Sequence, residues 1–99
     1  MIVELSVVPI GVGESLSKYI SDVLRLLEER GVKYQLNPMG TVVELEAFSE
    51  LGELLEDIRK HLEMKGAPRI YFVVKIDWRK KGTSMEYKIE SVKKKLGKS

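Results

Sequence analysis

Alternation of apolar and polar residues is the strongest pattern in this chain, and it predicts four β-strands. The alternating segments are residues 2–9, 32–37, 41–47 and 69–77. One side of each strand is apolar and is expected in a core: Val3, Leu5, Val7, Tyr34, Leu36, Val43, Leu45, Ile70, Phe72, Val74 and Ile76. The opposite sides are only half polar. The strands therefore have a second face that is too apolar for free solvation.

Three further segments space their apolar residues three or four apart, which is typical of amphipathic helices. The first is expected to end at Arg30, before Gly31, and the second to end before the segment Gly66-Ala67-Pro68. The predicted N-caps are Ser15, Ser49 and Thr83, the last in a capping-box pattern with Glu86. The apolar stripe of the third helix is Met85, Ile89, Val92 and Leu96.

A tight turn, Asn37-Pro38-Met39-Gly40, separates the second and third strands and predicts a β-hairpin. Proline sets φ to about −65° at the first corner of such a turn. Polar residues gather at the turn and along its strands: Gln35, Asn37, Thr41, Glu44 and Glu46. Several of them should point away from the helices.

The order strand–helix–strand, strand–helix–strand, helix predicts an α+β fold. Right-handed crossovers turn both units into the ferredoxin-like βαββαβ arrangement. It has a four-stranded antiparallel sheet, two helices on one face and here an extra C-terminal helix. With 99 residues and 43% hydrophobic content, we expect one such domain spanning residues 1–99.

The other face of the predicted sheet is left bare, and its residues are mixed in character. They are Ile2, Glu4, Ser6, Val8, Gln35, Val42, Glu44, Tyr71, Val73 and Lys75. A face that is too apolar for solvent and too polar for a core is typical of a subunit interface. We therefore expect a homo-oligomer that buries sheet against sheet.

Composition excludes several kinds of chemistry. There is no cysteine and only one histidine, His61, so a single chain has no disulfide, thiolate nucleophile or multi-histidine metal site. We expect His61 on a helix surface, far from Ser6, and thus no nucleophilic catalysis, no metal and no cofactor. No apolar run approaches the roughly 20 residues that span a bilayer. A soluble, cytoplasmic protein without a membrane partner is expected.

The charge is uneven along the chain. Residues 69–99 hold ten Lys and Arg against three Asp and Glu, a net of +7, whereas residues 1–68 hold seven against twelve, a net of −5. Such a basic end suits phosphates, including those of nucleic acids. A solvated helix face is the favoured interpretation, because no aromatic residue is interleaved with Lys93, Lys94 and Lys95.

Two glutamates on one predicted strand, Glu44 and Glu46, lie about 7 Å apart by strand rise. That spacing favours ligand binding over shared proton transfer, with solvated or salt-bridged glutamates as the alternative. Gly11-Val12-Gly13 precedes a helix but lacks the third glycine and the lysine of a phosphate-binding loop, so an ordinary loop is expected.

Several short motifs, in this order, resemble the small thiamine-binding (YkoF-like) family over nearly the whole chain. They are Val7-Val8-Pro9-Ile10-Gly11, Tyr34-Gln35-Leu36, Pro38-Met39-Gly40-Thr41 with Glu44, Gly66-Ala67-Pro68-Arg69, Lys75-Ile76-Asp77 with Arg79, and Met85 with Lys88 and Ser91-Val92. The resemblance implies a ferredoxin-like subunit in an oligomer, usually a tetramer. It also implies binding of thiamine or its hydroxymethylpyrimidine part without catalysis. Family members commonly have Glu-Gly-Glu where this chain has Glu44-Leu45-Glu46, and Leu45 is expected to face the core.

Thiamine joins an aminopyrimidine, which needs donors and acceptors at its edge, to a thiazolium cation, which favours carboxylates and aromatic faces. The candidate ligand-binding residues are Ser6, Asn37, Met39, Gly40, Thr41, Glu44, Glu46 and Tyr71. We expect Thr41 and Glu44 together to hold the ligand beside the turn. Alternatively, these polar groups only satisfy one another across subunits. A further alternative is a structural or nucleic-acid-binding oligomer that uses the basic C-terminal segment.

Overall fold

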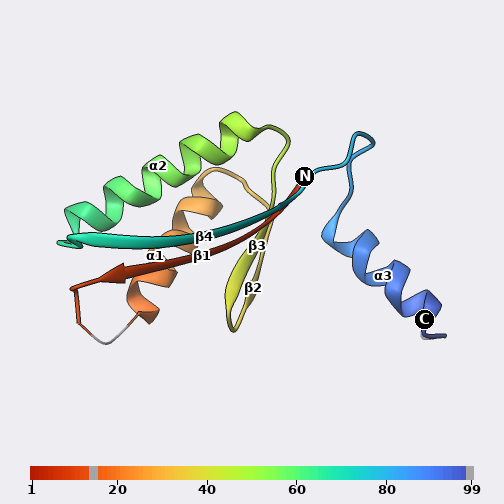
Figure 1. Ribbon diagram of the computed structural model, residues 1–99, viewed down its shortest axis with the longest axis horizontal. Coiled ribbons are helices and arrows are strands. Elements are labelled where there is room, and N and C mark those ends of the chain that lie inside the picture. The colour runs from red at the N-terminus through yellow and green to blue at the C-terminus, as the bar shows by residue number, and fades with distance from the viewer. Residues whose placement is uncertain (14–15, 98–99) are drawn as a thin grey trace.

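The structure is a computed structural model, which describes residues 1–13 and 16–97 (Figure 1). Its elements are β1 (Ile2–Ile10), α1 (Ser17–Glu29), β2 (Tyr34–Asn37), β3 (Gly40–Glu44), α2 (Phe48–Met64), β4 (Arg69–Asp77) and α3 (Met85–Lys95). This is the predicted order. β3 is shorter than predicted and leaves Glu46 beyond its end. The predicted cap Ser15 lies outside the described residues. No helix among the described residues has the length and apolar character needed to cross a membrane.

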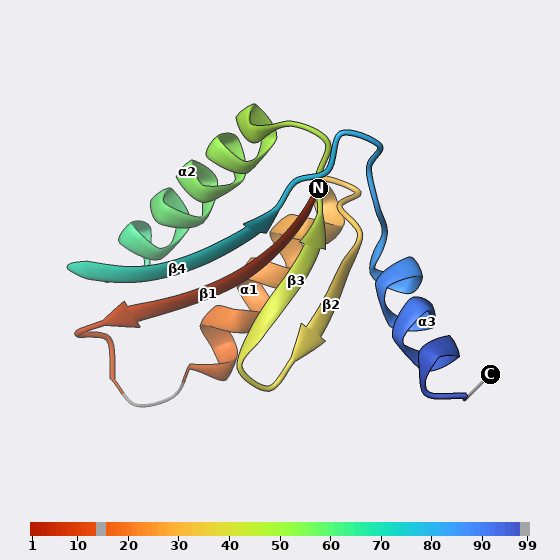
Figure 2. The ribbon, with the colours of Figure 1, turned by 45° about the vertical axis from the view of Figure 1, so that its right-hand side comes forward.

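The strands form one antiparallel sheet in the order β2-β3-β1-β4. In its register Val3 of β1 lies opposite Val43 of β3 and Ile76 of β4, so the apolar sides of these strands point the same way. α1 and α2 lie together on that side of the sheet (Figure 2). The predicted ferredoxin-like fold is confirmed, and α1 and α2 leave the other face of the sheet open.

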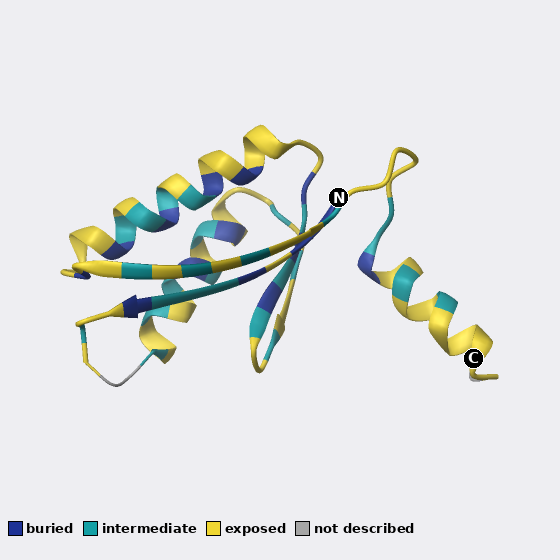
Figure 3. Cartoon of the chain, viewed as in Figure 1, coloured by how far each residue is buried: buried dark blue, intermediate teal, exposed yellow. Residues whose placement is uncertain are grey.

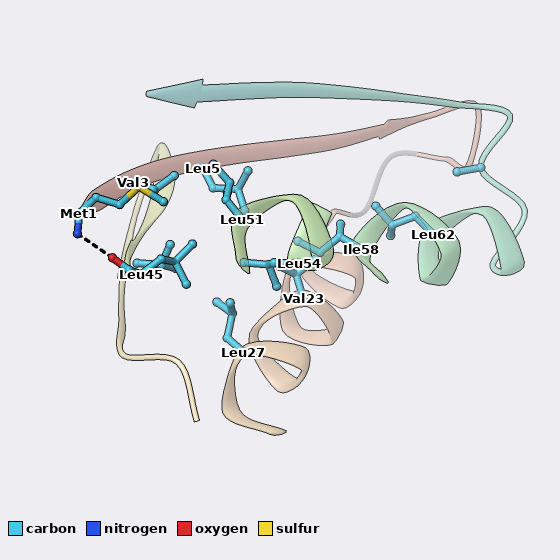
Figure 4. Packing of buried hydrophobic residues seen from close by; sticks show 12 residues of the cluster. Met1, Val3, Leu5, Val23, Leu27, Leu45, Leu51, Leu54, Ile58 and Leu62 are labelled. Carbon is cyan, nitrogen blue, oxygen red and sulfur yellow. Dashed lines mark hydrogen bonds between the residues drawn. The ribbon is translucent and has the colours of Figure 1, made fainter. Parts of the chain in front are cut away.

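The covered face and the two helices share one hydrophobic core (Figure 4). Its most deeply buried members are Val3, Leu27, Val43, Leu54, Ile58 and Leu62. Leu45 is also buried, as predicted, and its carbonyl accepts a hydrogen bond from the Met1 amino group at 2.6 Å. The prediction that Leu36 and Ile76 are core residues is wrong, because each borders one of two hollows described below and is exposed.

The N-caps of α2 and α3 differ from the predicted ones, because the cap is the residue whose backbone is still extended. In α2 this residue is Ala47, whose N–H donates to Glu50 Oε1 at 3.1 Å, and Ser49 lies inside the first turn. In α3 it is Ser84, whose hydroxyl accepts an N–H from the first turn at 3.0 Å. Thr83 precedes this cap and does not replace it.

A contact between a carboxylate and an imidazole links α1 to α2. Oδ2 of Asp22 lies 3.0 Å from Nε2 of His61. His61 lies on α2, as predicted, and its side chain is partly buried in this helix–helix contact. The hydrogen bond from His61 holds the pKa of Asp22 below its ordinary value.

The replacement Asp22→Asn should make the free energy of unfolding fall less steeply as the pH is lowered. A carboxyl whose pKa is lower in the folded chain stabilises the fold above its unfolded pKa of about 3.9, and this contribution is lost as the pH falls through the folded pKa. Urea unfolding between about pH 5 and pH 2 measures the change. The exposed Glu53, replaced with Gln, serves as the control. Equal acid slopes for Asp22→Asn and the unmodified protein would contradict the link.

α3 stands away from the sheet and the other two helices (Figure 1). It is held by polar contacts near its first turn. Oε1 of Glu44 accepts the Met85 N–H at 2.6 Å, and Lys88 forms an ion pair with Asp77. Beyond Met85 the predicted apolar stripe is exposed (Figure 3): Ile89, Val92 and Leu96. The stripe is therefore not part of this chain's core, whereas the lysines of the last turn are exposed as predicted.

Candidate functional site

Two hollows border the sheet. The larger one, here called the sheet groove, lies between the open face and the start of α3 and has a volume of about 480 Å³. The smaller one, here called the turn pocket, has a volume of about 280 Å³. It lies between the β2–β3 turn, the second half of β1 and the first half of α1, which are neighbours in Figure 2. Its apolar walls include Val7, Pro9, Leu16, Tyr19, Ile20 and Leu36.

The turn pocket brings together most of the residues predicted to hold a ligand: Ser6, Asn37, Met39, Gly40 and Thr41. Thr41 is only 7% exposed and lies opposite Leu5 in the sheet. In the part of the chain that the structure describes, neither the Ser6 nor the Thr41 hydroxyl has a hydrogen-bond partner. Oδ1 of Asn37 accepts a hydrogen bond from Gln35 at 3.2 Å, so the Asn37 amide N–H groups are left to donate elsewhere.

The other three predicted residues, Glu44, Glu46 and Tyr71, lie outside the turn pocket. Thr41 and Glu44 were expected to hold one ligand together beside the turn. They are three positions apart on β3 and therefore point to opposite faces of the sheet. The Glu44 carboxylate binds the first turn of α3 and lies 3.7 Å from the Lys33 ammonium. Glu46 is exposed beyond the end of β3, and Tyr71 is exposed on the open face of β4.

One edge of β1 is free along the turn pocket. The pairing of β1 with β3 stops at Leu5, whereas its pairing with β4 continues to the end of the strand. The main-chain groups of odd-numbered residues in β1 point toward β3. The Met1 carbonyl accepts the Leu45 N–H at 3.0 Å, and the Leu5 carbonyl oxygen lies 3.3 Å from where a Gly40 Cβ would stand. This direction repeats every second residue, so the N–H and C=O of Val7 point into the turn pocket.

The positions of two further residues, Pro9 and Met39, are consistent with a free edge of β1. The nitrogen of Pro9 points to the same side as that of Val7, and proline is tolerated there because no ladder hydrogen bond is lost. The register would place Met39 opposite Val7, but Met39 lies in the turn and is 89% exposed. Within residues 1–13 and 16–97, the Val7 main-chain groups have no partner on this side. Main-chain groups carry no sequence motif, and Pro9 is the one sign of this edge in the sequence.

Ion pairs line the sheet groove. The Lys75 ammonium lies 3.6 Å from Glu4, and the Lys88 ammonium binds Asp77. The hydrogen bond from Lys88 holds the pKa of Asp77 below its ordinary value. The described residues contain no group of three or more His, Asp and Glu side chains suited to a metal ion. The groove thus offers fixed charges of both signs.

The carboxylate of Glu4 lies where the two hollows approach each other. Its Cδ is 3.9 Å from the position that a Cβ of Gly40 would take, and Gly40 borders the turn pocket. Asn37 borders both hollows. The sequence places Glu4 on the open face but gives no reason to prefer it to Glu44, because only the strand register shows which of the two lies beside the turn.

Several relatives match nearly the full length of the chain. UPF0045 protein YqgV of Bacillus subtilis is 40% identical over 101 residues, which cover 96% of each chain. A UPF0045 protein of Methanothermobacter thermautotrophicus is 35% identical over 95 residues, or 94% of this chain and 96% of that one. No substrate or activity is part of either name.

Several solved structures share the fold. A hypothetical protein from Methanocaldococcus jannaschii superposes with a TM-score of 0.80 at 27% identity, covering 92% of this chain and 93% of that one. A Thermotoga maritima protein, provisionally described as a thiamine biosynthesis or salvage protein, superposes with a TM-score of 0.78 at 27% identity. The match covers 92% of this chain and 96% of that one.

A family model described as thiamine-binding protein matches residues 3–93. The matched segment runs from β1 into α3 and includes both sides of the turn pocket. This match confirms the resemblance seen in the sequence motifs. The chain belongs to the thiamine-binding protein family.

Proposed function

We propose that this is a cytoplasmic binding protein that takes thiamine, or its hydroxymethylpyrimidine part, into the turn pocket without catalysis. The family and the similarity to the Thermotoga maritima protein support a thiamine-related ligand. The choice of site rests on one observation: Ser6 and Thr41 both border the pocket, and among the described residues neither of their hydroxyls has a hydrogen-bond partner. His61 is engaged with Asp22, so neither hydroxyl has an imidazole beside it for activation.

The dimensions and walls of the turn pocket suit one heteroaromatic ring. Its volume of about 280 Å³ lies just below the ~300–1,000 Å³ typical of small-molecule pockets. Apolar side chains such as Tyr19 and Leu36 offer contact to the faces of a ring. The hydroxyl of Thr41 and the amide of Asn37 offer hydrogen bonds to its edge. The pyrimidine part of thiamine is thus the part that we place in the pocket.

The double replacement of Ser6 with Ala and Thr41 with Val should weaken thiamine binding about tenfold, because two neutral hydrogen bonds of roughly 0.5–1.5 kcal/mol each are lost. Calorimetric titration measures the change, and valine keeps the shape of threonine. Thr83→Val is the matched control, since Thr83 lies outside the turn pocket. Unchanged affinity in the double variant, or no binding of thiamine or pyrimidine by the unmodified protein at millimolar ligand, would remove this pocket from consideration.

The replacement Glu4→Gln should weaken the binding of thiamine and leave the binding of the neutral hydroxymethylpyrimidine unchanged. The thiazolium ring is a permanent cation, and Glu4 is the carboxylate beside the turn. The Glu4 side chain is 47% exposed and forms an ion pair with Lys75. We therefore expect the binding free energy of thiamine to fall by about 0.5–1 kcal/mol, or roughly two- to fivefold in affinity. Glu46→Gln is the control. Equal losses for both ligands would contradict a role in holding the cation.

We also propose that the protein works as a homo-oligomer, a tetramer by family resemblance, assembled through the open face of the sheet. An apolar patch lies on this face away from α3, and it is here called the open-face patch: Val8, Tyr71 and Val73. Tyr71 and Val73 are both exposed. A second subunit over this patch would remove apolar surface from water, which favours association.

A further inference from the structure

The free edge of β1 offers a hydrogen-bond donor and an acceptor side by side. The N–H and C=O of Val7 both point into the turn pocket, as the directions of the Met1 and Leu5 carbonyls show. In an antiparallel ladder, such a residue exchanges two hydrogen bonds with the residue opposite. The residue that would lie opposite Val7 is Met39, but it is part of the β2–β3 turn and is exposed to solvent. A ligand with one acceptor next to one donor would therefore complete this pair of bonds.

An aminopyrimidine has this arrangement along one edge. The ring nitrogen next to the amino-bearing carbon accepts a hydrogen bond, and the amino group beside it donates one. We infer that the free edge of β1 recognises the aminopyrimidine ring through its main chain. The Val7 N–H donates to that ring nitrogen, and the amino group donates to the Val7 carbonyl oxygen. This inference rests on the proposed function and adds which edge of the ligand is bound.

The ring then occupies the position of one residue of an added strand. The same geometry predicts selectivity for the amino group, because a 4-oxo pyrimidine presents the reverse order of donor and acceptor. Its ring N–H would face the Val7 N–H, and its oxo group would face the Val7 carbonyl. Both main-chain groups would be left without a hydrogen bond from the ligand, and a donor or acceptor that the ligand covers without a partner costs free energy.

Calorimetric titration with thiamine and oxythiamine tests this selectivity. Oxythiamine differs in the oxo group and the adjacent ring N–H and keeps the thiazolium cation. Thiamine is expected to bind about tenfold more tightly or better, since two main-chain hydrogen bonds depend on the amino group. Equal affinities would overturn recognition by the β1 edge and leave thiamine binding intact. No binding of either compound would reject the proposed function, and this inference with it.

Two variants distinguish what the Val7 N–H contributes to thiamine binding from what its side chain contributes. Val7→Pro removes the N–H, and Pro9 shows that a proline nitrogen on this side of β1 is compatible with the sheet. Val7→Ala keeps the N–H and removes both γ-methyl groups, so it measures what the side chain alone contributes. We expect thiamine to bind Val7→Pro about tenfold more weakly than Val7→Ala. Equal affinities of the two variants would overturn the inference.

Hydrogen exchange on the unmodified protein gives a readout that does not depend on the folding of Val7→Pro. Ser6 and Val8 point their N–H groups toward β4, whereas Val7 points its own toward the turn pocket. The Val7 amide should therefore exchange faster than its two neighbours and slow down when thiamine is added. A Val7 amide that exchanges equally fast with and without bound thiamine would overturn the inference.

Discussion

The replacement Ile58→Ala is expected to lower the free energy of unfolding by about 2–5 kcal/mol. Ile58 is fully buried in the middle of α2, where that helix packs on the sheet and on α1. Alanine would leave a cavity between these layers, because close-packed surroundings relax only in part. Domains of this size have about 5–15 kcal/mol of stability in all, so the loss should be plain in urea unfolding followed by circular dichroism.

Two further variants of α2 show whether burial is the cause. Met64 ends the same helix and is 86% exposed, so Met64→Ala should change the free energy by less than about 0.5 kcal/mol. Ile58→Val removes one methyl group and should cost about 0.5–1.5 kcal/mol. Similar costs for Ile58→Ala and Met64→Ala would contradict the placement of Ile58 at the centre of the core.

The replacement Val73→Lys is expected to dissociate the proposed homo-oligomer into single chains. Val73 lies in the open-face patch, opposite Ser6 in the register of β1 and β4. A lysine there would be buried against the next subunit without a partner, and a desolvated ammonium costs several kcal/mol. In a symmetric interface the same patch serves both subunits, so one substitution acts twice. Light scattering coupled to size exclusion measures the mass.

The matched variant Val92→Lys shows whether the subunits meet through the open face of the sheet or through α3. Val92 is exposed on the apolar stripe of α3, away from the open-face patch. If the subunits meet through the open face, Val92→Lys should keep the mass of the unmodified protein. Loss of assembly in Val92→Lys alone would assign the interface to α3. A mass equal to one chain for the unmodified protein would contradict the oligomer itself.

The fold was predictable because strand and helix periods are properties of residue type alone. Val3, Leu5 and Val7 alternate with more polar neighbours, and the crossover rule then leaves few ways to arrange two strand–helix–strand units. The N-caps were less predictable. Ser49 and Thr83 have the right side chains, but backbone conformation selects the capping residue, and it falls on Ala47 and Ser84.

The candidate site was predictable in part. The turn motif led to Asn37, Met39, Gly40 and Thr41, which all border the turn pocket, because they are close in sequence as well as in space. Glu44 was grouped with Thr41 although strand alternation separates them, and its contact with α3 depends on a helix 41 residues further along the chain. Whether the main-chain groups of Val7 have a partner depends on where the β1–β3 pairing stops. No residue type specifies that point.

Pro9 also affects whether a strand of another molecule can add to the sheet at this edge. A strand edge with free N–H and C=O groups is a template on which a second molecule can add a strand and begin to aggregate. The free edge of β1 is short, and Pro9 supplies no donor near its end, so an added strand would find few hydrogen bonds there. The free edge of β1 is therefore a poor template for a growing fibril.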